Sequence, residues 1–209
     1  MPEVMPVAPI ARSPIRIAGP VSLHSGWEVS AVRSIAALRL ADRTPLAKVL
    51  VRAAPSGEVA ARLGVRSGRA ARDDHGTLVV GSAPGEWLLI GAVGASAEMA
   101  ARIDVFADGR LVSVLDHTHG RALIRLTGVA AAGTLAKLCP IDLADRSTPD
   151  GTGFRSAVAR LATDVVRDDV DGTASYLLHC ERSSGQFLFD AVLDAGAEYG
   201  IEPDAFGAR

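Results

Sequence analysis

The same order of elements occurs twice along this 209-residue chain, and the repetition constrains the fold more than any single motif. The segment KVLVRAAPSGEVAARLGV, from Lys48, matches RALIRLTGVAAAGTLAKLC, from Arg121, as a strand followed by a helix. GEWLLIGAVGASAEMAARI, from Gly85, matches TASYLLHCERSSGQFLFDAVL, from Thr173, in the same way. Each half therefore predicts strand, helix, strand, strand, helix. We expect an α+β fold of two pseudo-repeated β-α-β-β-α lobes, with helices packed on mixed or antiparallel sheets.

The distribution of prolines indicates where an N-terminal arm ends and the folded domain begins. Four of the eleven prolines lie in the first 14 residues, and proline fixes φ and removes an amide donor. We therefore expect residues 1–30 to form an extended arm, either partly disordered or docked on a second subunit. We expect residues 31–209 to form a single domain of two lobes, at about 31–110 and 111–205.

The junction between the halves contains a short polar turn. Two apolar strand-like runs, Val112–Leu115 and Ala122–Leu126, flank the turn Asp116–Gly120, and this pattern predicts a β-hairpin. A turn at Thr127-Gly128 and a helix from Val129 to Leu138 follow. We expect this helix to cover the hairpin.

Composition narrows the functional classes. The net charge of -2 is not basic enough to predict nucleic-acid binding, and no apolar run approaches the roughly 18–20 residues of a membrane span. Prolines stand where a signal peptide would have its apolar core, so we expect a cytoplasmic protein. In that compartment Cys139 and Cys180 are expected as buried thiols rather than a disulfide.

Three residues are candidates for contact with a cofactor. Asp164 starts a buried strand, where a carboxylate needs an arginine, a backbone amide, or a ligand's amine or pterin ring as partner. Trp87 lies in an alternating strand, where core packing is the alternative to ligand contact. Arg125 shares one strand face with Arg121, and the pair could meet a partner's acid, an anionic ligand tail or solvent.

No metal centre or catalytic constellation is predicted. His117 and His119 would point the same way on a strand and could ligate a metal, but no third ligand has the spacing, which favours ordinary turn histidines. The chain has no Gly-x-Gly-x-x-Gly after a strand, no P-loop, no Gly-x-Ser-x-Gly elbow and no Cys-x-x-Cys.

Three stretches resemble known proteins. VLDHTHGRALIRLTGVAAAGTLAKLCPIDL is similar to the Asp-x-Ser-x-x-Gly, Gly-x-x-Ala-x-x-x-Leu and x-Asp pattern of the glycine-cleavage aminomethyltransferase (T-protein) fold. The pattern falls on Asp116, Thr118, Gly128, Ala132 and Asp142. APGEWLLIG and SYLLHCERSSGQFLFDAVLDAG resemble segments of the sarcosine oxidase gamma subunit, and the likeness runs over most of the chain.

The resemblance implies a T-protein-like domain that serves as the accessory gamma subunit of a heterotetrameric sarcosine oxidase. Such a complex demethylates sarcosine oxidatively and passes the one-carbon unit to tetrahydrofolate. The resemblance implies alpha, beta and delta-type partner subunits. NAD and the tetrahydrofolate-binding module are expected on the alpha subunit, the flavins FAD and FMN on the beta subunit, and zinc on the delta subunit. It implies a non-catalytic chain in an oxidoreductase complex of one-carbon metabolism.

The alternative is a free-standing tetrahydrofolate-binding protein, or a one-carbon transferase of aminomethyl or methyl groups. Asp164, Trp87 and Arg125 would then be the folate contacts. The family's Gly-Gly-x-x-Asp-Asp hairpin, which carries the folate-contacting carboxylate, is not reproduced in ARLATDVV, where Asp164 is the nearest counterpart. Aminomethyltransferases are also longer, so their C-terminal barrel is expected to be missing here.

Overall fold

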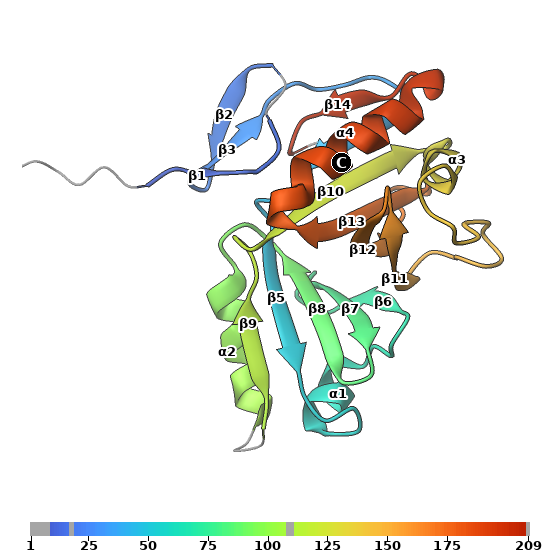
Figure 1. Cartoon of the computed structure of the whole chain (residues 1–209). Helices are drawn as coiled ribbons and strands as arrows, with labels where there is room; N and C mark the ends of the chain where they lie inside the picture. The colour runs from blue at the N-terminus through green and yellow to red at the C-terminus, as the bar shows by residue number, and fades with distance from the viewer. Residues whose placement is uncertain (1–8, 17–18, 108–110, 208–209) are drawn as a thin grey trace, which may run out of the picture.

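The computed structural model describes residues 9–16, 19–107 and 111–207. Two β-sheets meet through their inner faces, and each carries two helices on its outer face (Figure 1). Alternate side chains of the central strands therefore pack in two cores, one beneath the helices and one between the sheets.

The first sheet has five strands. In spatial order they are β6 (Ala70–Arg72), β7 (Leu78–Ala83), β8 (Glu86–Gly91), β5 (Ala47–Arg52) and β9 (Ser113–Asp116). Helices α1 (Glu58–Leu63) and α2 (Ser96–Ala107) cover its outer face. There Val49 and Val51 pack with Met99 and Ile103 of α2, since the apolar spacing of α2 presents one stripe to the sheet.

The second sheet has six strands. In spatial order they are β11 (Gly153–Val158), β12 (Leu161–Arg167), β13 (Ser175–Glu181), β10 (Arg121–Gly128), β4 (Leu38–Asp42) and β14 (Glu202–Asp204). Its outer face is covered by α3 (Ala131–Ala136) and α4 (Gly185–Gly196), with 3₁₀ turns η1 (Arg182–Ser184) and η2 (Ala197–Tyr199) flanking α4. The order β10, α3, β12, β13, α4 repeats β5, α1, β7, β8, α2. The predicted α+β duplication is confirmed.

The two units exchange one strand each. Strand β4 precedes β5 in the chain but pairs antiparallel with β10, so that Leu40 lies opposite Leu126. Strand β9 precedes β10 but pairs antiparallel with β5, so that Leu115 lies opposite Leu50. The predicted hairpin between Val112–Leu115 and Ala122–Leu126 is therefore wrong, because its two strands lie in different sheets.

An Asp-x-Thr turn stands at each crossing between the sheets. The amide of Thr44 donates to Asp42 Oδ1 at 2.9 Å, and the amide of Thr118 donates to Asp116 Oδ1 at 2.8 Å. These aspartates close the turns with their side chains, which is a common role of Asp in tight turns. The same three-residue device thus reverses the chain at both crossings.

Each threonine of these turns also ties its crossing to the first strand of the other unit. The amide of Leu123 in β10 donates to Thr44 Oγ1 at 3.2 Å, and the amide of Lys48 in β5 donates to Thr118 Oγ1 at 3.0 Å. Both threonine side chains are buried. A buried amide without a partner is costly, so the two hydroxyls help to fix the exchanged pairing.

Strand β10 continues through the predicted turn at Thr127-Gly128. Gly128 pairs with Leu38 of β4 and has φ +147°. A Cβ at this position would collide with the Ala37 carbonyl oxygen. Glycine is required here by a close approach of two backbones rather than by a turn, and the following helix begins at Ala131 instead of Val129.

Part of the proline-rich N-terminal segment is folded onto the rest of the chain. Strands β1 (Ala11–Arg12), β3 (Trp27–Ser30) and β2 (Val21–His24) form a small sheet in that order. The Trp27 ring stacks on His119, with 4.7 Å between ring centroids. Residues 11–12, 21–24 and 27–30 of the predicted arm are thus strands of this chain, and residues 1–8 and 17–18 lie outside the described part.

The thiols of Cys139 and Cys180 are free and buried, as predicted. Burial raises the pKa of Cys180 to about 11, which keeps the thiol protonated at neutral pH. In the described part of the chain, no helix is long and apolar enough to cross a membrane.

Candidate functional site

The layer between the two sheets has an apolar middle and polar ends. Leu123 of β10 packs in the middle with Leu88 of β8 and Leu177 of β13. Two residues further along β10 in each direction, on the same face, stand Arg121 and Arg125. Arg121 lines a cleft at one end of the layer and Arg125 lines a second hollow at the other.

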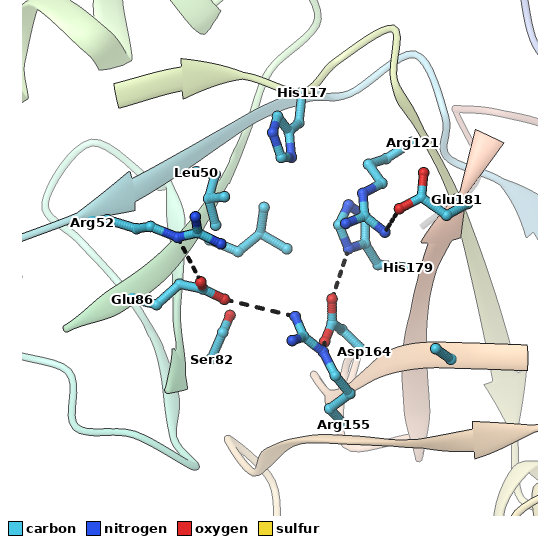
Figure 2. Close-up of a pocket in the computed structure, with 12 residues that line it drawn as sticks. Leu50, Arg52, Ser82, Glu86, His117, Arg121, Arg155, Asp164, His179 and Glu181 are labelled. Carbon is cyan, nitrogen blue, oxygen red and sulfur yellow. Dashed lines mark hydrogen bonds and ion pairs between the residues drawn. The ribbon is translucent and has the colours of Figure 1, made fainter. Parts of the chain in front are cut away.

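The cleft at the Arg121 end, called here the inter-sheet cleft, has a volume of about 250 Å³. Both sheets contribute to its walls, with ionisable side chains on each side (Figure 2). Its lining consists of Leu50, Arg52, Ser82, Glu86, Leu88, His117, Arg121, Arg155, Ala162, Asp164, His179 and Glu181.

A chain of ion pairs and hydrogen bonds crosses the cleft from one sheet to the other (Figure 2). Glu86 on β8 accepts from Arg52 Nε at 2.8 Å and lies 3.7 Å from Arg155 Nη2 on β11. Arg155 Nε donates to Asp164 Oδ1 at 2.6 Å. Asp164 Oδ2 lies 3.1 Å from His179 Nδ1. Both oxygens of Asp164 are therefore engaged.

The Asp164–His179 pair is held in one protonation state. Burial alone would raise the pKa of Asp164, but hydrogen bonds from His179 and Arg155 outweigh burial and lower it, so the carboxylate is ionised. Burial lowers the pKa of His179, although Asp164 opposes the shift, so the ring is neutral at neutral pH. An ionised Asp164 requires the proton on Nδ1, which leaves His179 Nε2 as a bare acceptor.

His179 Nε2 is the unusual atom of the site. The residue is only 4% exposed, and Nε2 is buried with no hydrogen-bond partner among the described residues. Buried polar atoms are nearly always paired in folded proteins. The wall of the cleft therefore contains a buried acceptor that an N–H or O–H donor would complement.

The same sheet also holds a looser ion pair, between β10 and β13. Arg121 Nη1 lies 2.8 Å from Glu181 Oε1, with side chains 24% and 65% exposed. His117 also lines the cleft. Its pKa is lowered mainly by burial and further by the positive charge of Arg121. His119, in contrast, is stacked on Trp27, so the two turn histidines do not act together. The described residues contain no group of three or more His, Cys, Asp or Glu placed to hold a metal.

The three predicted site residues do not converge. Asp164 lies in the inter-sheet cleft. Trp87 faces the helix-covered core, where its Nε1 donates to the Val65 carbonyl at 2.7 Å, so core packing accounts for it. Arg125 lies at the far end of the layer, ion-paired with Asp168 and donating to Ser175 Oγ at 2.8 Å.

Sequence reasoning missed His179 and Arg155. His179 ends the apolar run SYLLH, and a histidine closing a buried strand was a signal that could have been used. Arg155 gives no such signal, because its contact with Asp164 depends on the register of β11 against β12, in which these two residues lie opposite each other.

Comparison with solved structures identifies the fold. A chain of the heterotetrameric sarcosine oxidase from Corynebacterium sp. U-96, in complex with pyrrole 2-carboxylate, matches with a TM-score of 0.69 and 23% identity, over 85% of this chain and 90% of that one. The glycine cleavage system aminomethyltransferase T from Bartonella henselae matches with a TM-score of 0.69 and 15% identity, over 89% of this chain and 55% of that one. The chain has the aminomethyltransferase fold. The resemblance found in the sequence is thus confirmed as a likeness of fold.

Sequence comparison gives a shorter match. The aminomethyltransferase of Geobacillus thermodenitrificans (strain NG80-2) is 37% identical over 106 residues, which is 49% of this chain and 28% of that protein. The chain therefore spans little more than a quarter of this curated relative. No family model matches the sequence.

Proposed function

We propose that the chain is a gamma-type accessory subunit of a heterotetrameric sarcosine oxidase. The observation that carries the proposal is the extent of the two structural matches. The chain aligns with 90% of a chain of the Corynebacterium sarcosine oxidase but with only 55% of the Bartonella aminomethyltransferase. It thus covers most of a chain of the first assembly and about half of the second enzyme.

The chemistry of the inter-sheet cleft supports an accessory role. A general base must be free to take a proton, whereas Asp164, Glu86 and Glu181 are each paired with an arginine. His179 is neutral but buried. We infer that alpha, beta and delta-type subunits in the cytoplasm carry the redox chemistry, with FAD, FMN and NAD bound to them.

Affinity purification of the tagged full-length chain from its source cells tests the proposal. We expect it to copurify in fixed stoichiometry with larger chains that carry flavin absorbance. The complex should oxidise sarcosine, and removal of this chain should lower the yield of assembled complex. The chain purified alone should be colourless and inactive.

A chain that elutes alone from those cells, with the flavin-containing sarcosine-oxidising activity in other fractions, contradicts the proposal. A tagged variant carrying Val129→Ala, at an exposed position, serves as the matched control for handling losses.

Tetrahydrofolate binding is the second candidate, because Asp164 stands in a cleft of an aminomethyltransferase-like fold. Two observations weigh against a resident folate. Trp87 and Arg125 lie outside the cleft lining, and its volume of about 250 Å³ is below the range of about 300–1,000 Å³ typical of sites for drug-sized ligands. Calorimetric titration with tetrahydrofolate, comparing the wild type with Asp164→Ala, decides the matter. We expect no binding by either.

A further inference from the structure

The inter-sheet cleft presents charges of both signs in equal number. Three arginines line it, and so do three carboxylates. Burial lowers the pKa of both histidines in the lining, His117 and His179, which favours their neutral forms, so the arginines and carboxylates balance. An anionic or a cationic ligand gains little electrostatic binding energy here, since its attraction to one set of groups is offset by repulsion from the other. A ligand that carries both signs complements the cleft.

The groups of the cleft differ in how firmly they are held. Asp164 receives hydrogen bonds at both oxygens, and Arg155 and Arg52 both pair with Glu86. Arg121 has only Glu181 as an ion-pair partner in the described chain, and the Glu181 side chain is 65% exposed. Exposed ion pairs contribute little free energy. Arg121 and Glu181 can therefore separate at low cost and each accept a group of opposite charge.

His179 Nε2 adds a directional requirement. As a buried acceptor without a partner among the described residues, it is complemented by an N–H or O–H donor. Arg121 is close enough to His179 to contribute to lowering its pKa. A molecule held by Arg121 and Glu181 thus lies beside His179, which lines the same cleft.

We propose that the inter-sheet cleft binds a small zwitterionic amino acid, whose carboxylate pairs with Arg121 and whose amine donates to Glu181 and to His179 Nε2. The volume of about 250 Å³ suits a molecule smaller than a typical drug-sized ligand. This binding goes beyond the accessory role proposed above and does not require the other subunits.

Calorimetric titration of the isolated full-length chain tests the proposal with four probes that separate its elements. Glycine and N-methylglycine carry both the carboxylate and N–H donors. Trimethylglycine keeps both charges but has no N–H, and acetate has no amine. We expect glycine and N-methylglycine to bind, and trimethylglycine and acetate to bind about tenfold more weakly or worse.

Variants link the binding to the cleft. We expect Arg121→Gln to weaken glycine binding about tenfold or more while leaving the circular dichroism spectrum unchanged, because its ion pair with the exposed Glu181 side chain contributes little to stability. Arg62→Gln is the matched control, because Arg62 forms a similar exposed pair with Glu58 on α1, outside the cleft. Its glycine affinity should equal that of the wild type.

Two results overturn the proposal: equal or absent binding of all four probes, or unchanged glycine affinity in Arg121→Gln. Neither result bears on copurification with flavin subunits, so failure here is distinguishable from failure of the accessory role.

Discussion

At the scale of single residues, the burial of Lys48 is unfavourable for the stability of the fold. Its side chain is fully buried on β5, at the position equivalent to Leu123 on β10, since both backbone amides bond to a crossing threonine. Its Nζ donates to the carbonyls of Thr44 and Leu46 at 2.6 and 2.7 Å. Burial lowers the pKa of Lys48 to about 7. The charged ammonium form therefore destabilises the folded state relative to the unfolded chain.

This shift predicts a pH-dependent stability. Between pH 7 and 10.5 the unfolded chain binds a proton at Lys48 that the folded chain does not, so the free energy of unfolding rises with pH. We expect Lys48→Met to remove a rise on the order of 3 kcal/mol across that range. Urea denaturation at several pH values measures the slope.

The control for this experiment is Lys137→Met, since the Lys137 side chain is 40% exposed and pairs with Glu198. It should keep the wild-type slope. The explanation is wrong if Lys48→Met keeps the wild-type slope as well.

The sequence allowed the burial of single residues to be predicted, but not their contacts across strands. It predicted that Asp164 needs a partner and that Trp87 could be core packing, because both inferences follow from burial on a strand. It could not place Arg155 or Glu86 beside Asp164, since these contacts join three strands of two sheets. Side-chain clusters made by non-local pairing leave no local pattern in the sequence.

At the scale of elements, the repeated order of strands and helices was predictable, whereas the pairing of β9 was not. Two apolar runs with a short turn between them satisfy every local rule for a hairpin. The observed pairing differs because β9 pairs instead with β5, a strand whose paired residues lie 61 to 67 positions earlier in the chain. The second Asp-x-Thr turn, at Asp42–Thr44, was the available hint, because it marks both crossings as equivalent.

We expect the crossing threonines to be important for stability. Thr44→Val and Thr118→Val each leave a buried strand amide without its acceptor, which should cost about 1–3 kcal/mol apiece. Chemical denaturation followed by circular dichroism measures both.

The matched control is Thr134→Val, because Thr134 is equally buried in α3 and its hydroxyl has no partner in the described chain. Its unfolding free energy should change by less than about 0.5 kcal/mol, in line with a group that contributes no hydrogen bond. Losses of equal size at all three positions would mean that the crossings have no special role.

At the scale of the whole molecule, the exchanged strands and the apolar layer join the two sheets into one cooperative unit. Strand β4 lies next to β10 in the second sheet but leads directly into β5 of the first. Unfolding of the second sheet would therefore remove the pairing partner of β4, and unfolding of the first sheet would remove that of β9. Domains joined only by a linker would not be coupled in this way.

Unfolding of a variant with a defect in one sheet tests the coupling. Leu40→Ala creates a cavity beneath the helices of the second sheet and should cost about 2–5 kcal/mol. In a Trp27→Phe background, the fluorescence of Trp87 reports on the first sheet. We expect this signal and the circular dichroism to shift together to lower denaturant.

Val129→Ala, at an exposed position, should leave both signals in place. A Trp87 transition that stays at its original midpoint in Leu40→Ala would show that the sheets unfold independently.

The reciprocal placement of β4 and β9 makes the backbone link between the two units partly redundant. A polypeptide cut between them would yield two pieces, each carrying a segment whose hydrogen-bonding partner belongs to the other piece, so the pieces would recognise each other as a non-covalent heterodimer. By the same geometry, two intact copies at high concentration have a route to an intertwined dimer, in which each unit closes on its counterpart from the neighbouring molecule.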